Sequence, residues 1–86
     1  MKTLVSIIIV NYNGKKFLDN LFFSIKKQTY QNIEIVFIDN NSIDGSVSYL
    51  NNHVLEKYST LKRKTKIIIL PKNVGFAEAN NIGAKE

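Results

Sequence analysis

The 86-residue chain contains no cysteine, so disulfide bonds and thiolate metal sites are excluded. A chain without cysteine fits a reducing compartment, and we expect a cytoplasmic protein. No apolar run approaches the ~20 residues that a membrane-spanning helix needs. With only four glycines, the sequence also lacks the Gly-x-Gly-x-x-Gly and Walker-type loops that bind phosphate groups. Nucleophile-elbow and metalloprotease motifs are absent as well.

Acidic residues are scarce relative to basic ones, seven against twelve, which gives a net charge of +5. Much of the surplus lies in the run Leu-Lys-Arg-Lys-Thr-Lys at residues 61–66. Such a run can bind phosphate, nucleic acid or acidic lipid, or it can be a solvated loop that leads into a strand. No aromatic residues interleave it, so a base-stacking platform is not indicated. We expect no nucleic-acid partner.

Three short apolar runs alternate with stretches of helical periodicity. The runs 4–10, 33–38 and 66–70 predict strands, and residues 15–27, 46–60 and 76–85 predict helices. Strands that alternate with helices indicate a parallel sheet, and crossovers between parallel strands are right-handed. We therefore predict an α/β fold of order βαβαβα, in which residues 1–86 form one domain around a three-stranded parallel sheet of order 3-2-1.

Two apolar stripes define the helix faces that we expect to pack on this sheet. The first comprises Phe17, Leu18, Leu21, Phe22 and Ile25, and the second comprises Val47, Leu50, Val54, Tyr58 and Leu61.

The first predicted strand is apolar on both faces although the predicted order places it at an edge of the sheet. Such composition suits a strand with a neighbour on each side. We therefore expect a further strand that this sequence does not contain, which indicates a truncated domain. The open edge could also pair with a second copy of the chain.

Each predicted strand runs into a cluster of Asn, Asp or Gly. The carboxyl ends of parallel strands lie at one edge of the sheet, where open α/β sheets bind ligands. Asp39 is the only carboxylate directly at a strand end, so it could accept an N–H of a nucleobase or a ribose hydroxyl, or it could cap the following turn. Tyr12 could cover a base or pack within its loop. Ser42 and Asp44 could each cap the helix that follows.

Three segments resemble the signatures of family 2 glycosyltransferases of the GT-A fold. They are Val-Ser-Ile-Ile-Ile-Val-Asn-Tyr-Asn-Gly at 5–14, Ile-Asp-Asn-Asn-Ser-Ile-Asp-Gly-Ser at 38–46, and Asn-Val-Gly-Phe-Ala-Glu-Ala-Asn-Asn-Ile-Gly at 73–83. The third is similar to the version found in rhamnosyltransferase-like members. The resemblance implies that the chain is the N-terminal, Rossmann-like half of a GT-A domain.

The resemblance also implies an activated donor, a UDP- or dTDP-sugar, and transfer of its hexosyl or rhamnosyl group to an acceptor hydroxyl. The acceptor would be a saccharide or lipid-linked molecule in glycan or polysaccharide synthesis. Asp39 would accept the N3–H of uracil or thymine, and Tyr12 would lie against the base. The nucleotide-binding residues implied are Asn11, Tyr12, Asn13, Asp39, Asn41, Asn73 and Gly75.

Family members hold a divalent metal, Mg or Mn, through an Asp-x-Asp-like motif a little beyond the position of Gly83, and carry a catalytic carboxylate further along. Neither lies in this sequence, so we assign no metal ligand and no catalytic residue, and we expect the chain alone to be inactive as a transferase. The full-length form would be cytoplasmic or peripheral to the cytoplasmic membrane. The alternative is a non-catalytic interaction or oligomerisation module.

Overall fold

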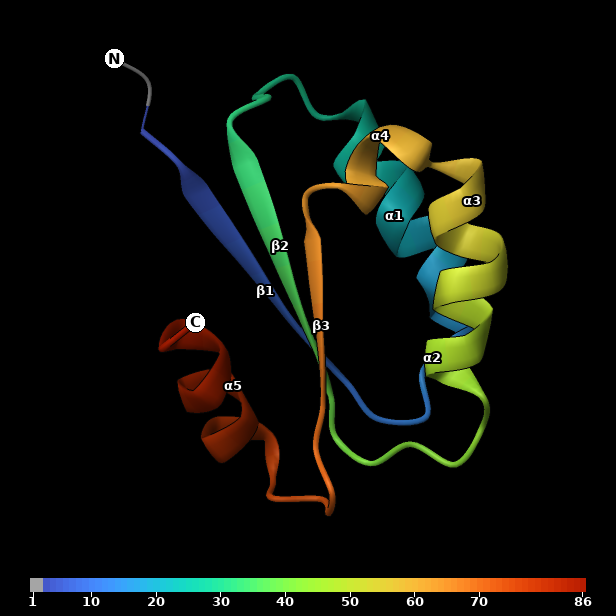
Figure 1. The fold of residues 1–86 in the computed structure, drawn as a ribbon, viewed down its shortest axis with the longest axis vertical. Helices are drawn as coiled ribbons and strands as arrows, with labels where there is room; N and C mark the ends of the chain where they lie inside the picture. Colours follow the sequence, from blue (N-terminus) through green and yellow to red (C-terminus); the bar gives the residue numbers. More distant parts are fainter. Residues whose placement is uncertain (1–2) are drawn as a thin grey trace.

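Three parallel strands lie between two helical layers in the computed structural model, which describes residues 3–86. Helices α1 to α4 cover one face of the sheet, and α5 covers the other (Figure 1). The elements are β1 (Val5–Asn11), the 3-10 turn η1 (Lys15–Phe17), α1 (Leu18–Lys27), β2 (Ile33–Asp39), α2 (Ser46–Tyr49), the π turn η2 (Leu50–Val54), α3 (Leu55–Lys57), α4 (Ser59–Lys62), β3 (Thr65–Ile69) and α5 (Phe76–Ala84). Residues 1 and 2 of the predicted domain lie outside the described part.

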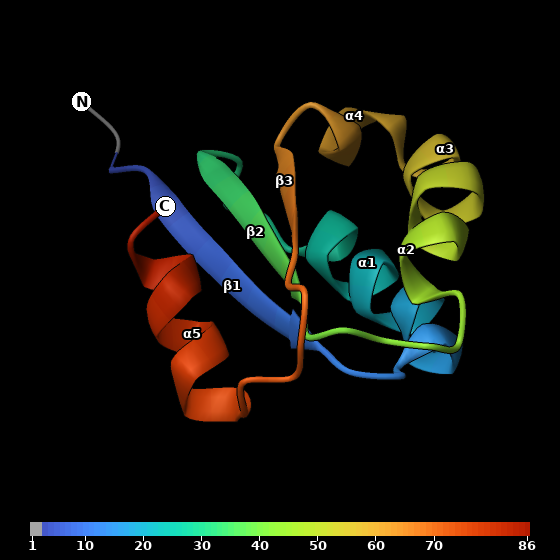
Figure 2. The ribbon, with the colours of Figure 1, turned by 60° about the horizontal axis from the view of Figure 1, so that its bottom comes forward.

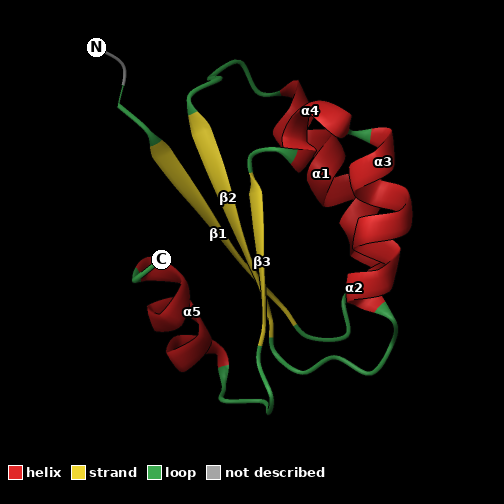
Figure 3. Ribbon diagram, in the orientation of Figure 1, coloured by secondary structure: helices red, strands yellow, loops and turns green. Residues whose placement is uncertain are grey.

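The sheet has the order β1-β2-β3 with all strands parallel, which confirms the predicted fold class and strand order (Figure 3). Its strands begin and end within one residue of the predicted bounds. The register pairs Asn11 with Asp39, and Asp39 with Ile69. The polar ends of β1 and β2 therefore lie side by side. Within residues 3–86, β1 has β2 as its only strand neighbour.

The alternation of side chains along β2 divides the core into two halves. Ile35 and Phe37 face α1 and pack with its buried Phe22, whereas Val36 and Ile38 face α5. Both halves are apolar because β2 is covered on both faces, as a central parallel strand requires. Asp39 continues the first alternation and Asn40 the second, so the two residues point to opposite sides of the sheet.

The second predicted helix, residues 46–60, is wrong as a single helix. The structure has α2, the π turn η2 and α3, and the helix breaks at Tyr58, whose φ is −109° and ψ 62°. A π turn inserts an extra residue into the helical repeat and so rotates the residues that follow. This rotation buries Leu55, which lay outside the predicted stripe, beside Val54.

Phe17 also departs from the predicted apolar face of the first helix. The segment 15–17 is a 3-10 turn rather than the start of the α-helix. The tighter 3-10 geometry places its side chains differently from those of an α-helix. As a result Phe17 is 60% exposed, whereas Leu18, Phe22 and Ile25 are buried. Each helix in residues 3–86 is too short or too polar to cross a membrane.

Helix α5 packs closely on the sheet because a glycine faces the strands. A Cβ atom placed on Gly83 would lie 2.7 Å from Cγ2 of Ile8 and 3.3 Å from Cγ1 of Ile38. Both neighbours are β-branched strand residues, whose side chains have few alternative rotamers. The absence of a side chain at this position therefore sets the distance between α5 and the sheet.

We predict that Gly83→Ala lowers the free energy of unfolding. Overpacking costs about 1–3 kcal/mol, and the gain in helix propensity offsets about 1 kcal/mol of that, so a net loss of about 1 kcal/mol is expected. Urea unfolding measures it. Asn81→Ala, on the exposed side of α5, is the matched control and should be neutral or slightly stabilising. A stabilised Gly83→Ala variant would show that the helix can move away from the sheet without cost.

Candidate functional site

The loops that follow the three strands gather at one edge of the sheet, at the bottom of Figure 1 (see also Figure 2). The centre of this edge is Asp39, which is only 2% exposed. Its Oδ1 accepts a hydrogen bond from Nδ2 of Asn11 at 3.0 Å, and its Oδ2 accepts one from the backbone N–H of Ser42 at 2.9 Å. Both carboxylate oxygens are therefore held in fixed directions.

Ser42 joins the loops after β1 and β2. Its hydroxyl oxygen accepts hydrogen bonds from Nδ2 of Asn11 at 3.2 Å and from the backbone N–H of Asn13 at 2.9 Å. Oδ1 of Asn13 in turn accepts from the backbone N–H of Ile43 at 2.8 Å. Ser42 thus serves as a link between two loops, which sequence reasoning missed when it considered this residue a helix cap.

Gly14 leaves the space that the Asn11 side chain occupies. A Cβ atom at residue 14 would lie 2.5 Å from Oδ1 of Asn11, which is shorter than any ordinary contact. The backbone of Gly14 has φ −103°, a value that other residues adopt freely. The constraint on this position is therefore steric, and it protects the hydrogen bond between Asn11 and Asp39.

Asn40 holds the loop after β3 by hydrogen bonds on the other side of the sheet. It is 3% exposed, and its Oδ1 accepts from the backbone N–H of Val74 at 2.9 Å. Its Nδ2 donates to Oδ1 of Asn73 at 3.1 Å, and the same oxygen accepts from the backbone N–H of Gly75 at 2.8 Å. Sequence reasoning missed Asn40, although its position directly after Asp39 at a strand end was a usable signal.

The remaining predicted site residues lie on the surface of this edge. Tyr12 is 53% exposed at the end of β1. Asn41 is exposed with φ 65°, and Asn13 has φ 52°, both in the left-handed region that asparagine tolerates better than most residues. Gly75, with φ 85°, is the residue directly before α5. The structure brings Asn11, Asn13 and Asp39 into one network and places Asn73 and Gly75 in a second, linked through Asn40.

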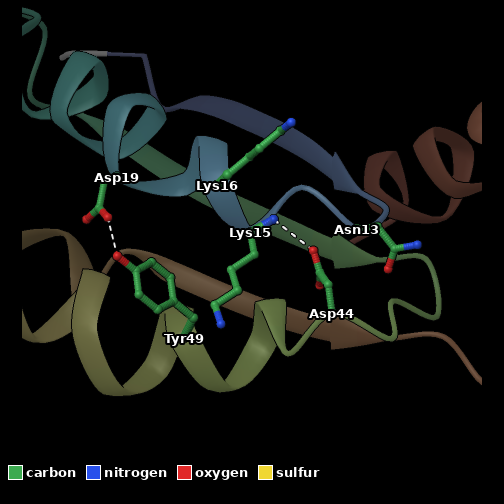
Figure 4. Close-up of a pocket in the computed structure, with 6 residues that line it drawn as sticks. All are labelled: Asn13, Lys15, Lys16, Asp19, Asp44 and Tyr49. Atoms are coloured by element: carbon green, nitrogen blue, oxygen red, sulfur yellow. Dashed lines mark hydrogen bonds between the residues drawn. The ribbon is translucent and has the colours of Figure 1, made fainter.

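An open pocket of about 500 Å³ lies beside this network, between η1, α1 and α2 (Figure 4). Its lining residues are Asn13, Lys15, Lys16, Asp19, Asp44 and Tyr49. The Tyr49 hydroxyl donates to the carboxylate of Asp19, and this hydrogen bond raises the pKa of Tyr49 above its usual value. Only Asn13 belongs to both the pocket and the predicted nucleotide-binding set.

Asp44 fixes the start of α2. Burial alone would raise the pKa of Asp44, but hydrogen bonds from the Ser46 hydroxyl and from the backbone N–H groups of Lys15 and Ser46 outweigh burial, so the pKa lies below its usual value. The backbone contacts measure 3.0 Å to Lys15 and 2.9 Å to Ser46. The charged carboxylate is therefore the form that stabilises the fold.

We predict that Asp44→Asn lowers the free energy of unfolding at pH 7 by about 1 kcal/mol. Because the folded-state pKa is below the unfolded value of 3.8, the contribution is fully present above that pH and disappears as the pH falls through the folded-state pKa. The wild type and the variant should therefore converge in acid. Urea unfolding between pH 7 and pH ~3 measures this. Glu78→Gln, an exposed change on α5, is the control, and a difference for Asp44→Asn that stays constant with pH would contradict the assignment.

The residues at this edge do not fit a divalent metal. No group of three or more His, Asp or Glu side chains that could hold a metal ion occurs in the described part of the chain. The carboxylate oxygens of Asp39 and Asp44 already accept N–H or O–H donors. What the site offers is a set of oriented hydrogen-bond acceptors beside an exposed aromatic ring.

The arrangement is that of an open parallel α/β sheet with polar residues gathered at the carboxyl edge, where proteins of this class bind their ligands. The family profile described as "Glycosyl transferase family 2" matches residues 6–86, so the chain belongs to this family. It is 40% identical over 80 residues to an uncharacterised glycosyltransferase of Haemophilus influenzae, covering 93% of this chain and 23% of that protein. It is 28% identical over 80 residues to the putative teichuronic acid biosynthesis glycosyltransferase TuaG of Bacillus subtilis, covering 93% of this chain and 30% of TuaG.

Among solved structures, the fold is similar to that of the mannosyltransferase PcManGT from Pyrobaculum calidifontis, determined in complex with GDP-Man and Mn²⁺. The TM-score is 0.85 at 24% sequence identity, over 94% of this chain and 23% of that one. This likeness confirms the GT-A fold. The chain thus spans less than a third of the length of each of these proteins.

Proposed function

We propose that this chain holds the base and ribose of a nucleotide-sugar donor, a UDP- or dTDP-sugar, for a glycosyltransferase. The observation that carries the proposal is the fixed carboxylate of Asp39 at the centre of the strand ends, with the exposed ring of Tyr12 on the neighbouring loop. Asn11, Asn13, Asn41, Asn73 and Gly75 complete the proposed pocket.

The hydrogen bonds of Asp39 leave it able to bind a further donor. An ionised carboxylate has about four acceptor positions, and the bonds from Asn11 and Ser42 account for one on each oxygen. Those two bonds also fix the orientation of the carboxylate before a ligand arrives, so no side-chain entropy is lost on binding.

A carboxylate acceptor that faces ring position 3 of a pyrimidine selects bases that carry an N–H at that position. Uracil and thymine present N3–H, and guanine presents N–H donors as well. Cytosine has an unprotonated ring nitrogen at the same position, which would face the carboxylate with a lone pair. We therefore expect UDP and dTDP to bind and CDP to bind more weakly, because the lone pair on cytosine N3 would face the carboxylate and repel it instead of donating a hydrogen bond.

The reaction we propose for the whole enzyme is transfer of a hexosyl or rhamnosyl group to the hydroxyl of a saccharide or lipid-linked acceptor. The name of the relative TuaG supports a role in polysaccharide synthesis. The PcManGT complex contains GDP-Man and Mn²⁺, which supports a nucleotide-sugar donor and a divalent metal in the whole enzyme. We propose a cytoplasmic enzyme, peripheral to the membrane in its full-length form, and assign no catalytic residue to this chain.

We predict that UDP and dTDP shift the backbone amide resonances around Tyr12 and Asp39, and that CDP shifts them less. Heteronuclear NMR of the labelled chain, titrated with each nucleotide to millimolar concentration, measures this. GDP is included because guanine carries the same type of donor. If none of the four nucleotides moves these resonances while the spectrum remains that of a folded chain, the proposed pocket does not exist.

The same titration on variants assigns the contacts. Asp39→Ala should weaken UDP binding about tenfold or more, whereas Asp44→Ala, outside the proposed set, should change it little. Because Asp39→Ala also removes the partner of Asn11, Tyr12→Ser serves as a second variant that changes an exposed side chain. Loss of stacking should weaken binding about tenfold. Equal effects of Asp39→Ala and Asp44→Ala would count against Asp39 as the base acceptor.

The outer edge of β1 favours a second candidate function, a module that pairs with another copy of itself. Leu4 and Val5 are 53% and 44% exposed next to this edge. An unpaired strand edge can add a strand from another chain. Analytical ultracentrifugation separates the two functions, since a dimer that disappears in the variant Val5→Lys, whose altered side chain is exposed, would support pairing through β1, and a monomeric wild type would exclude it.

A further inference from the structure

The outward side of α1 and of the turn before it carries two exposed phenylalanine rings. Phe17 is 60% exposed and Phe23 is 50% exposed, whereas Phe22 on the same helix is fully buried. Packing of α1 on the sheet accounts for Phe22 but gives the other two rings no partner in the core. Exposed aromatic residues that gather on one element mark a surface that contacts something else.

Phe23 lies on one side of α1 together with exposed polar residues. Asn20, Phe23 and Lys27 are spaced by three and four residues, which places them on one side of α1, and Lys16 precedes Asn20 by four residues in the 3-10 turn before the helix. This side lies opposite the buried Leu18 and Ile25. All four side chains on it are exposed.

Each exposed ring lies beneath a lysine ammonium group. Nζ of Lys16 is 5.2 Å from the centre of the Phe17 ring, and Nζ of Lys27 is 5.3 Å from the centre of the Phe23 ring. Figure 4 shows that Lys15 extends toward Tyr49 of α2, whereas Lys16 extends away from it. Lys16 therefore belongs to the outward side of α1.

Acidic side chains do not neutralise this surface. Asp19 is the only acidic residue between positions 15 and 27, and its carboxylate accepts the Tyr49 hydroxyl on the side toward α2. The basic residues in the same stretch are Lys15, Lys16, Lys26 and Lys27. The outward side thus combines apolar rings with positive charge only.

We propose that this surface, the α1 outer face formed by Lys16, Phe17, Phe23 and Lys27, binds a membrane surface that contains anionic phospholipids. The helix lies in the plane of the interface, the phenylalanine rings enter the boundary between headgroups and acyl chains, and the lysine ammonium groups reach the lipid phosphates. This names a surface and a lipid class for the membrane association proposed above, and it does not depend on the nucleotide site.

The composition of the α1 outer face favours lipid over a protein or a nucleic acid. Protein interfaces are depleted in lysine, which supplies all the charge of this surface. Single-stranded nucleic acids bind in positively charged grooves in which bare aromatic rings stack with successive bases. Here the rings lie on the convex side of a helix and are capped by ammonium groups, an arrangement that matches the headgroup layer of an anionic bilayer.

A tryptophan at position 23 tests the insertion directly, because the chain contains no other tryptophan. With vesicles in which about a quarter of the phosphatidylcholine is replaced by phosphatidylglycerol, the fluorescence of Phe23→Trp should shift to the blue and be quenched by brominated acyl chains. Pure phosphatidylcholine should have little effect. Phe76→Trp is the matched control, since Phe76 is 72% exposed on α5 at the other face of the sheet. The emission wavelength of this tryptophan should remain that of a water-exposed indole when vesicles are added.

Vesicle co-sedimentation of the chain tests the charges. Lys16→Gln/Lys27→Gln should weaken binding to the anionic vesicles about twentyfold, whereas Lys57→Gln/Lys85→Gln, which removes the same charge from exposed positions elsewhere, should change it by less than about threefold. Equal losses in the two double variants would overturn the proposal in favour of non-specific attraction.

The fluorescence experiment can also overturn the proposal. A blue shift of Phe23→Trp with an oligonucleotide but not with vesicles would favour a nucleic-acid surface instead, and no shift with either would overturn the proposal outright.

Discussion

The hydrogen bond from Asn11 to Asp39 connects the end of β1 to the end of the central strand β2, and the loops after these two strands depend on it. Both side chains are almost fully buried, so little water competes for the bond. A carboxylate in such a place is tolerated only when its oxygens have donors. Asn11 and the backbone of Ser42 supply them. Gly14 keeps the space clear, since any larger residue would displace the amide of Asn11.

Two consecutive residues at the end of β2 organise the loops on both sides of the sheet. Asp39 points to the α1 side and orders the loops after β1 and β2, while Asn40 points to the α5 side and orders the loop after β3. The backbone supports this arrangement, because the N–H of Asn40 donates to the carbonyl of Asn11 at 2.8 Å and the N–H of Leu70 donates to the carbonyl of Asp39 at 2.9 Å. The loop after β3 is thereby fixed to β2, and the loops after β1 and β2 are fixed both to β2 and to each other.

The sheet could be predicted from the sequence because buried strands appear in it as apolar runs. The position of Asp39 at a strand end followed from the same pattern. The hydrogen-bond partners of Asp39 could not be predicted, since Asn11 is far away in the chain and becomes a neighbour only through the strand register. The π turn that buries Leu55 could not be predicted either, because an added residue in a helix has no hydrophobic periodicity of its own. Phe17 continued an apolar stripe but lies in a 3-10 turn that directs it to solvent.

The most direct test of the central claim is a comparison of UDP with its N3-methyl analogue. Methylation replaces the N–H that we assign to the carboxylate of Asp39 with a methyl group, which cannot donate and occupies the space of that hydrogen bond, and it leaves the ribose and the diphosphate unchanged. Calorimetric titration of the chain should show binding of the analogue about tenfold to a hundredfold weaker than that of UDP, as expected for loss of a hydrogen bond to a charged group. Equal affinities would contradict the assignment of Asp39 as the acceptor of the base.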